Sequence, residues 1–195
     1  LIDVHYSPGR IGRNGKTDHL MLKTPQSGNA FYDLEGWLDN LSGRHPVKVD
    51  TAIISPVKHH QQRPCRMNQH SGIEFIGSGA RRYSFGGAAY RVAAGSIVLV
   101  GPGIPYAMEK ERGQDTLILG GTFSPRSPEL PGFPELWLIF EPAQPLAIQH
   151  RIAEVYRCLQ YRRTPIADCL AGSLMLSILE QIVVESKTPV PELDP

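Results

Sequence analysis

Hydrophobic and polar positions divide the chain into a first part typical of strands and a later part typical of helices. Glycine, proline and strand-forming residues dominate up to about Pro145. Residues 146–186 contain one glycine and one proline, and their apolar positions recur with helical spacing. The change predicts a β-rich part followed by helices.

Short apolar runs in the first part predict strands. Residues 81–85 and 88–92 are separated by Gly86-Gly87, the signal of a tight hairpin. The run 96–100 is too apolar to alternate, so we expect it to be covered on both faces. Several short strands separated by turns at this spacing indicate a sandwich or barrel. The other predicted strands are residues 73–78, 104–108, 116–122 and 136–140.

Residues 31–41 read as a short helix, because their apolar side chains fall on one face. Gly43 is placed to end this helix. The alternative is a duplicated β-unit, since His19 and Tyr32 recur at the same spacing as His70 and Tyr83. We favour the helix. Prolines punctuate residues 125–134, which predicts no regular structure there.

Two helices are predicted at the end of the chain, as an antiparallel hairpin. The first has Ile148, Ile152 and Val155 on one face and ends near Arg163. Thr164 is placed as the N-cap of the second helix, with Pro165 at its first position.

The apolar surface of the second helix is wider than packing on one neighbour requires. We therefore predict that part of it faces a second subunit, although a helix buried within its own domain is the alternative. The predicted dimerisation residues are Leu170, Leu174, Met175, Ile178 and Ile182.

Composition excludes several classes of protein. The 20 Lys+Arg and 19 Asp+Glu leave a net charge of +1, which argues against a surface built to hold nucleic acid. No run approaches the length of a membrane span, and the start lacks the pattern of a signal peptide. Three cysteines without a Cys-x-x-Cys spacing indicate a reducing compartment, so we expect a cytoplasmic protein without membrane contact.

No catalytic, metal or cofactor site is predicted from the residues alone. His59, His60, Cys65 and His70 are close in sequence, but their spacing matches no tetrahedral zinc site. No Gly-x-Ser-x-Gly elbow occurs. Cys158 and Cys169 fall on the predicted helices, where they read as packing residues.

The stretch from Gly95 through the apolar run 96–100 and Gly101-Pro102-Gly103 to Tyr106 resembles the second motif of the cupin β-barrel, a double-stranded β-helix. In metal-binding cupins a histidine of this motif joins a His-x-His pair and a glutamate. Here Tyr106 stands at the histidine position, and Asn68 and His70 offer only one imidazole. The resemblance implies a barrel that keeps its cavity and has lost its metal.

Polar residues on the barrel strands are the candidates for binding a small molecule, because a ligand site needs a few directional groups among apolar walls. Each has an alternative role, such as a tyrosine that closes the barrel end or Glu74 on the outer face. We expect Arg81 and Arg82 to be solvated. The predicted ligand-binding residues are Arg66, His70, Glu74, Tyr83, Tyr90, Tyr106 and Met108.

The order of a cupin barrel, a proline-rich passage, two amphipathic helices and a linker ending in Asp194-Pro195 is similar to the N-terminal half of AraC/XylS-type transcription regulators. The resemblance implies that the barrel binds an effector, that the second helix pairs subunits, and that a helix-turn-helix DNA-binding domain follows outside this chain. It divides the chain into an N-terminal arm and short helix (1–44), a cupin-like barrel (45–145), a helical dimerisation hairpin (146–186) and a linker (187–195).

The predicted fold is thus mostly β with C-terminal helices, and the predicted function is that of an effector-sensing and dimerisation domain without enzymatic activity. Two alternatives stay open. One is a metal-dependent cupin enzyme, an isomerase or dioxygenase, that uses His60, His70 and Glu74. The other is a stand-alone binding barrel.

Overall fold

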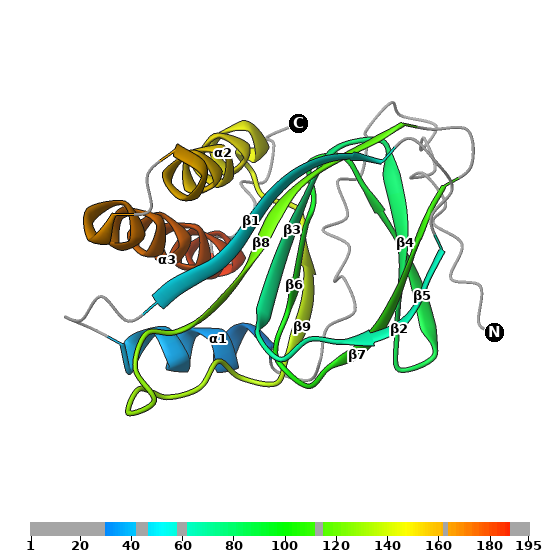
Figure 1. The fold of residues 1–195 in the computed structure, drawn as a ribbon. Coiled ribbons are helices and arrows are strands. Elements are labelled where there is room, and N and C mark those ends of the chain that lie inside the picture. Colours follow the sequence, from blue (N-terminus) through cyan, green and yellow to red (C-terminus); the bar gives the residue numbers. More distant parts are fainter. Residues whose placement is uncertain (1–29, 42–46, 58–61, 112–114, 162–163, 188–195) are drawn as a thin grey trace, which may run out of the picture.

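Strands form the centre of the molecule, with one helix before them and two after (Figure 1). The computed structural model describes residues 30–41, 47–57, 62–111, 115–161 and 164–187, without the side chains of 62–66, 161 and 187. Its elements are α1 (Ala30–Asp39), β1 (Val47–Val57), β2 (Gln62–Met67), β3 (Ser71–Ser78), β4 (Ala80–Phe85), β5 (Ala88–Ala93), β6 (Ile97–Val100), β7 (Pro105–Lys110), β8 (Thr116–Pro125), β9 (Trp137–Phe140), α2 (Pro145–Tyr161) and α3 (Pro165–Lys187).

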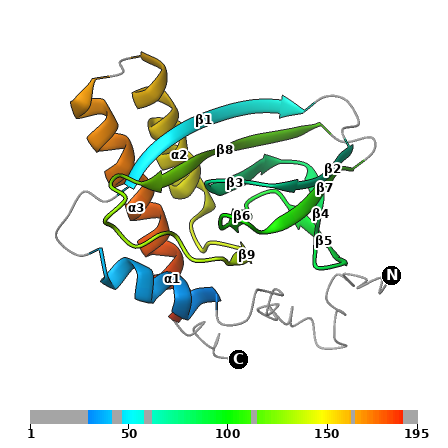
Figure 2. The same cartoon turned by 60° about the horizontal axis from the view of Figure 1, so that its bottom comes forward.

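The strands form two antiparallel sheets that face each other. One has five strands in the order β1-β8-β3-β6-β9, and the other has four in the order β2-β7-β4-β5. The three helices cover the face of the five-stranded sheet that points away from the four-stranded one (Figure 2). The prediction of a mostly β fold, with a barrel of two facing sheets followed by a two-helix hairpin, is confirmed.

The five-stranded sheet separates two apolar cores. In β3, Ile73 and Phe75 belong to the outer core beneath the helices, whereas Ile76 belongs to the inner core between the sheets. All residues of β6 are buried, because Ile97 and Leu99 face the outer core and Val98 and Val100 face the inner one. The prediction that this run is covered on both faces is therefore confirmed.

The short helix predicted near residue 31 is confirmed as α1, and these residues form no β-unit. Leu34 and Trp37 of α1 are buried in the outer core. The Trp37 indole donates a hydrogen bond to the carbonyl oxygen of Pro131 at 3.0 Å, and its ring packs edge-on against Phe133, with 4.9 Å between centroids. These contacts hold the proline-rich passage, which has no regular structure, onto the body of the protein.

The predicted hairpin glycines and the predicted cap of the last helix have the expected geometry, whereas Gly43 lies outside the described residues. Gly86 and Gly87 have φ angles of 56° and 87°, the left-handed values that a tight hairpin requires and that glycine adopts without strain. They join β4 to β5, with Phe85 opposite Ala88. The Thr164 hydroxyl accepts a hydrogen bond from the Ala167 N–H at 3.2 Å, which caps α3 as predicted.

The strand β1 was not predicted, because its pattern is that of an edge strand. It pairs only with β8 in its sheet, and the register shifts at Asp50. Ile53 and Ile54 are consecutive apolar residues, so apolar and polar positions do not alternate along this strand. Both are partly exposed. Pro56 is tolerated near its end, as is usual for an edge.

The inner face of α3 lies very close to β1. A Cβ atom at Gly172 would lie 2.3 Å from the carbonyl oxygen of Val47, so only glycine allows this approach.

By length and composition α3 is apolar enough to cross a membrane. Its buried side chains pack in the outer core of this chain.

Burial corrects the predicted dimerisation residues. Met175, Ile178 and Ile182 lie in the outer core with no more than 1% exposure, so they have no surface to offer to a second subunit. Leu174 is half-buried against the same core, whereas Leu170 is 51% exposed. The prediction was wrong for the three buried residues because the broad apolar surface of α3 is filled by α1, α2 and β1 of its own chain.

Polar contacts tie the end of α3 to the start of α2. The Glu185 carboxylate accepts a hydrogen bond from the Ala143 N–H at 2.7 Å and another from the Gln181 amide at 2.6 Å. Arg151 of α2 donates to Gln181 in turn. The last turns of α3 are thereby attached to the segment that leaves β9.

Replacing Gly172 by alanine should destabilise the fold by about 1–3 kcal/mol, because the new methyl group overlaps the Val47 carbonyl and forces α3 away from β1. Urea denaturation followed by circular dichroism measures this loss. Gly36→Ala is the control, since nothing lies within 4 Å of that position in α1. It should stabilise by about 0.5–1 kcal/mol through helix propensity. Equal effects of the two substitutions would contradict the close approach.

Candidate functional site

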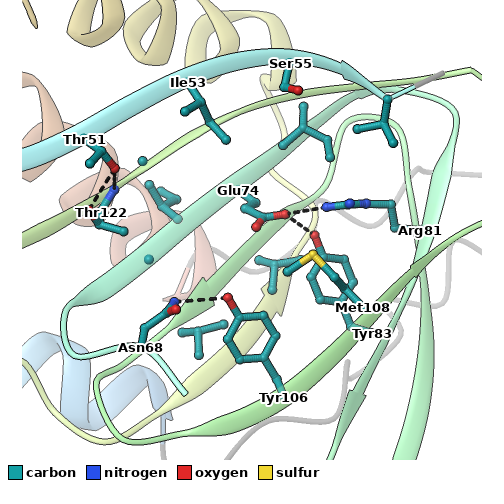
Figure 3. Close-up of a pocket in the computed structure, with 17 residues that line it drawn as sticks. Thr51, Ile53, Ser55, Asn68, Glu74, Arg81, Tyr83, Tyr106, Met108 and Thr122 are labelled. Atoms are coloured by element: carbon teal, nitrogen blue, oxygen red, sulfur yellow. Dashed lines mark hydrogen bonds and ion pairs between the residues drawn. The ribbon is translucent and has the colours of Figure 1, made fainter. Parts of the chain in front are cut away.

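A cavity of about 240 Å³ lies between the two sheets. Its lining joins the inner faces of β1, β3, β6 and β8 to those of β4 and β7 (Figure 3). Apolar and polar side chains contribute in similar number. The lining residues are Thr51, Ile53, Ser55, Val57, Asn68, Gly72, Ile73, Glu74, Arg81, Tyr83, Val98, Val100, Tyr106, Met108, Ile118, Gly121 and Thr122.

A charged cluster crosses the cavity from one sheet to the other (Figure 3). Glu74 projects from β3 of the five-stranded sheet, and its Oε2 accepts a hydrogen bond from Arg81 Nη1 at 3.0 Å. The same oxygen accepts a 2.5 Å hydrogen bond from the Tyr83 hydroxyl. Arg81 and Tyr83 both belong to β4 of the four-stranded sheet. One carboxylate oxygen therefore links the two sheets through an ion pair and a short hydrogen bond.

The structure corrects the expectation that Arg81 is solvated, since its side chain is only 3% exposed. Along β4, Arg81, Tyr83 and Phe85 are buried, whereas Arg82 is exposed as predicted. Alternate residues of a strand share a face, so the buried aromatic residues already required Arg81 to point inward. The alternation of inward and outward positions along β4 thus indicated a buried Arg81. The expectation of a solvated side chain followed the general rule that arginine is exposed.

Burial and the Glu74 carboxylate raise the pKa of Tyr83 well above its ordinary value near 10, while Arg81 opposes this shift. Burial is the larger cause, because it disfavours the charged phenolate. The phenol therefore stays protonated and acts as the hydrogen-bond donor to Glu74.

Two further polar pairs line the cavity away from the charged cluster. The Asn68 amide donates to the Tyr106 hydroxyl oxygen at 3.1 Å. The Thr51 and Thr122 hydroxyls lie 2.9 Å apart on the neighbouring strands β1 and β8. Asn68, Thr51, Ser55 and Thr122 were not among the predicted ligand-binding residues. Alternation gives no sign of Thr51, because β1 was not recognised as a strand, whereas Thr122 shares its face of the predicted strand β8 with Ile118 and could have been found.

The structure brings four of the seven predicted ligand-binding residues to the cavity and leaves three elsewhere or undescribed. Glu74, Tyr83, Tyr106 and Met108 line the cavity. His70 has a side chain that is 51% exposed, with its Nδ1 3.9 Å from an Asp50 oxygen, and it is not part of the lining. The backbone of Arg66 pairs with Tyr106, but its side chain lies outside the described part.

Tyr90 belongs to an aromatic stack beside the cavity lining. Phe85 and Trp137 stack face to face, with centroids 4.4 Å apart and planes 1° from parallel. The Tyr90 ring lies 5.2 Å from Trp137, and Phe85 also contacts Tyr106 at 5.9 Å. The stack connects β4 and β5 of the four-stranded sheet to β9 of the five-stranded one.

The residues at the metal-ligand positions of the cupin motif do not fit a metal ion. Asn68 and Tyr106 supply a neutral amide and a neutral phenol, which hydrogen-bond to each other. Glu74 is paired with Arg81, and His70 lies outside the lining. Within the described ranges no three His, Cys, Asp or Glu side chains gather as a metal requires. His59, His60 and the Cys65 side chain lie outside the described residues.

Sequence comparison identifies the family. Residues 58–181, more than half of the chain, match the family model described as an AraC-like ligand binding domain. No curated protein is similar enough in sequence to count as a match.

Solved structures with a similar arrangement share little sequence with this chain. ToxT from Vibrio cholerae is 11% identical, with a TM-score of 0.45 over 75% of this chain and 61% of that one. ToxT bound to an unsaturated fatty acid is also 11% identical, with a TM-score of 0.43 over 72% of this chain and 57% of that one. An RmlC-like cupin from Shewanella frigidimarina is 13% identical, with a TM-score of 0.34 over 44% of this chain and 71% of that one. The chain thus spans about three-fifths of the ToxT structures.

We expect the stability contributed by Tyr83 to depend on pH, because its pKa is raised in the folded state. This stability is fully present below pH 10, the ordinary tyrosine pKa, and is lost as the pH rises above that value. The free energy of unfolding of the wild type should therefore fall more steeply between about pH 10 and 11 than that of Tyr83→Phe.

Urea denaturation at a series of pH values measures this difference. At pH 7, Tyr83→Phe should cost about 1–2 kcal/mol through the lost hydrogen bond to Glu74. Tyr32→Phe is the control, since Tyr32 is exposed and should leave both the stability and its pH dependence unchanged. Parallel pH profiles for the wild type and Tyr83→Phe would show that the phenol is not held protonated by the fold.

Proposed function

Because the chain belongs to the family of AraC-like ligand binding domains, we propose that it is the effector-sensing and dimerisation domain of a cytoplasmic transcription regulator. A small molecule enters the cavity between the sheets and modulates a helix-turn-helix DNA-binding domain outside this chain. No bond is made or broken. The observation that carries the proposal is the cavity itself, in which a charged cluster and two polar pairs are set among apolar side chains.

The position of the cavity supports a role in signalling. Glu74 belongs to the five-stranded sheet and is bonded to two residues of the four-stranded one, so a ligand that contacts it can act on both sheets. The helices pack on the other face of the five-stranded sheet, and α3 is tied to the segment after β9 through Glu185. A ligand shifts the equilibrium between two arrangements of these sheets and helices by the difference between its affinities for the two. Residues 187–195 would then act as the linker to the DNA-binding domain.

Binding in the cavity is tested with a substitution that fills it. Ser55 is half-buried on the edge strand β1 and lines the cavity, so Ser55→Trp should occupy the space with little strain. We expect compounds that raise the melting temperature of the wild type, found by screening a metabolite library, to lose this effect with Ser55→Trp. In the full-length regulator the same compounds should change the affinity for promoter DNA by about 5–150-fold.

The control for this experiment is Ile54→Trp, which adds the same ring at the neighbouring position of β1, outside the cavity lining. It should keep the response to every compound. Compounds that stabilise Ser55→Trp as well as the wild type would bind elsewhere and contradict the proposal, as would a library without any compound that Ser55→Trp excludes.

Exposed apolar side chains near both ends of α3 support dimerisation through this helix. Ile166 and Val184 are 81% and 62% exposed, and their separation of five helical turns places them on the same face as Leu170. We therefore propose Ile166 and Val184, beside the predicted Leu170, in place of the three buried residues. Large apolar side chains aligned on one exposed face are typical of an interface.

Leu170→Asp should convert a dimer to monomers, because it buries an unpaired charge at the contact. Sedimentation equilibrium measures the change. Met175→Ala is the informative comparison, since Met175 is buried in the outer core. It should lower the free energy of unfolding by about 2–5 kcal/mol without a direct effect on association. A wild-type chain that stays monomeric, or a Leu170→Asp variant that stays dimeric, would contradict pairing through α3.

A further inference from the structure

The charges that line the cavity cancel each other. Glu74 and Arg81 are the charged side chains in the described lining, and they form an ion pair at 3.0 Å. Lys110, opposite Arg81 on β7, is buried but paired with Asp115 at 3.6 Å and is not part of the lining. Neither charge of the Glu74–Arg81 pair is therefore available to neutralise a charge on a ligand.

The hydrogen bonding of this pair is incomplete on both sides. Both hydrogen bonds to Glu74 fall on Oε2, and Oε1 receives none from the described residues. The Arg81 Nε–H is buried and also lacks a partner among them. A buried donor without an acceptor lowers the stability of the fold, so the Glu74–Arg81 pair lacks hydrogen bonds that a further group could supply. A hydroxyl or primary amide in the cavity can donate to Glu74 Oε1 and accept from the Arg81 guanidinium, because it donates and accepts at once.

We propose that the cavity is specific for an uncharged molecule that presents a hydroxyl or amide group to Glu74 and Arg81. This inference rests on the proposed function and states which chemical class the site accepts. A carboxylate would accept from Arg81 but face the Glu74 carboxylate, and an ammonium group would donate to Glu74 but face the Arg81 guanidinium. Either would also bring an uncompensated charge into a largely buried space.

The volume and the remaining lining agree with a compact neutral ligand. A cavity of about 240 Å³ is small for a ligand site. Valine, isoleucine and methionine side chains form its apolar wall. The Thr51–Thr122 and Asn68–Tyr106 pairs add neutral polar groups at other points of the lining. No further charge of the described lining is available there, so the rest of the ligand is also recognised without charge.

The experiment uses four probes that share one ring and differ in a single polar group. These are cyclohexylmethanol, cyclohexanecarboxamide, cyclohexanecarboxylate and cyclohexylmethylammonium. Their dissociation constants for this chain are measured by ligand-observed NMR at pH 7. The alcohol or the amide should bind at least about tenfold more tightly than either charged probe. Ser55→Trp should abolish this binding.

Two variants test the role of the ion pair. Glu74→Gln leaves the Arg81 charge uncompensated, so the preference should invert and the carboxylate should become the tightest of the four probes. The double variant Glu74→Gln/Arg81→Met carries neither charge. It avoids an unpaired buried arginine, and it should bind the alcohol more weakly than the wild type while still rejecting both charged probes. Circular dichroism checks that each variant is folded.

Each result distinguishes this inference from the proposed function. Tighter binding of the carboxylate or the ammonium probe by the wild type, abolished by Ser55→Trp, would overturn the inference and leave the cavity as a ligand site. The inference is also overturned if Glu74→Gln folds and keeps the wild-type preference. Failure of all four probes to bind the wild type, in a cavity large enough to hold them, would count against both.

Discussion

The five-stranded sheet must be buried on both faces, and the architecture of the molecule follows from this constraint. Its central strands, β3 and β6, carry large apolar side chains on both sides. An apolar sheet face left in water would forfeit the main driving force for folding. The three helices cover one face and the four-stranded sheet covers the other. A closed outer core and a barrel interior are the result.

The two cores differ in what they enclose. The outer core is filled by side chains of α1, α2 and α3, and the glycine at position 172 allows α3 to approach the backbone of β1. The inner core contains apolar side chains as well, but it also encloses Glu74, Arg81 and Tyr83. A buried charge is tolerated only with a partner, so these side chains are held in one arrangement. Polar groups held in fixed positions are what a selective cavity requires.

The charged cluster also joins the two layers mechanically. Glu74 is contributed by the sheet that carries the helices, and its partners are contributed by the opposite sheet. Any change at this carboxylate therefore acts on both sheets at once. The helices share strands β1 and β8 with the cavity, so the distance between the cavity and the helical layer is the thickness of one sheet.

Local patterns were sufficient to predict most of the elements. The Gly86-Gly87 hairpin, the buried strand β6, the helix α1 and the Thr164 cap each depend on residues close in sequence, whose conformational preferences act within a few positions. Tyr83 and Glu74 could be chosen as cavity residues from their strands. Arg81 could have been chosen as well, from the alternation in β4, and was missed because composition was given more weight than register.

The sequence by itself determined most of the strands, turns and helices, though not β1 and β2, and with them the fold class, because these depend on periodicity and on the special geometry of glycine, proline and capping residues. Only the tertiary structure decided which side chains meet. It paired Glu74 with Arg81 across two sheets, buried Met175 and Ile178 within their own chain, and left Leu170 in solvent. Such contacts join residues from different layers, and their positions are set by the packing of whole sheets and helices, which no local pattern specifies.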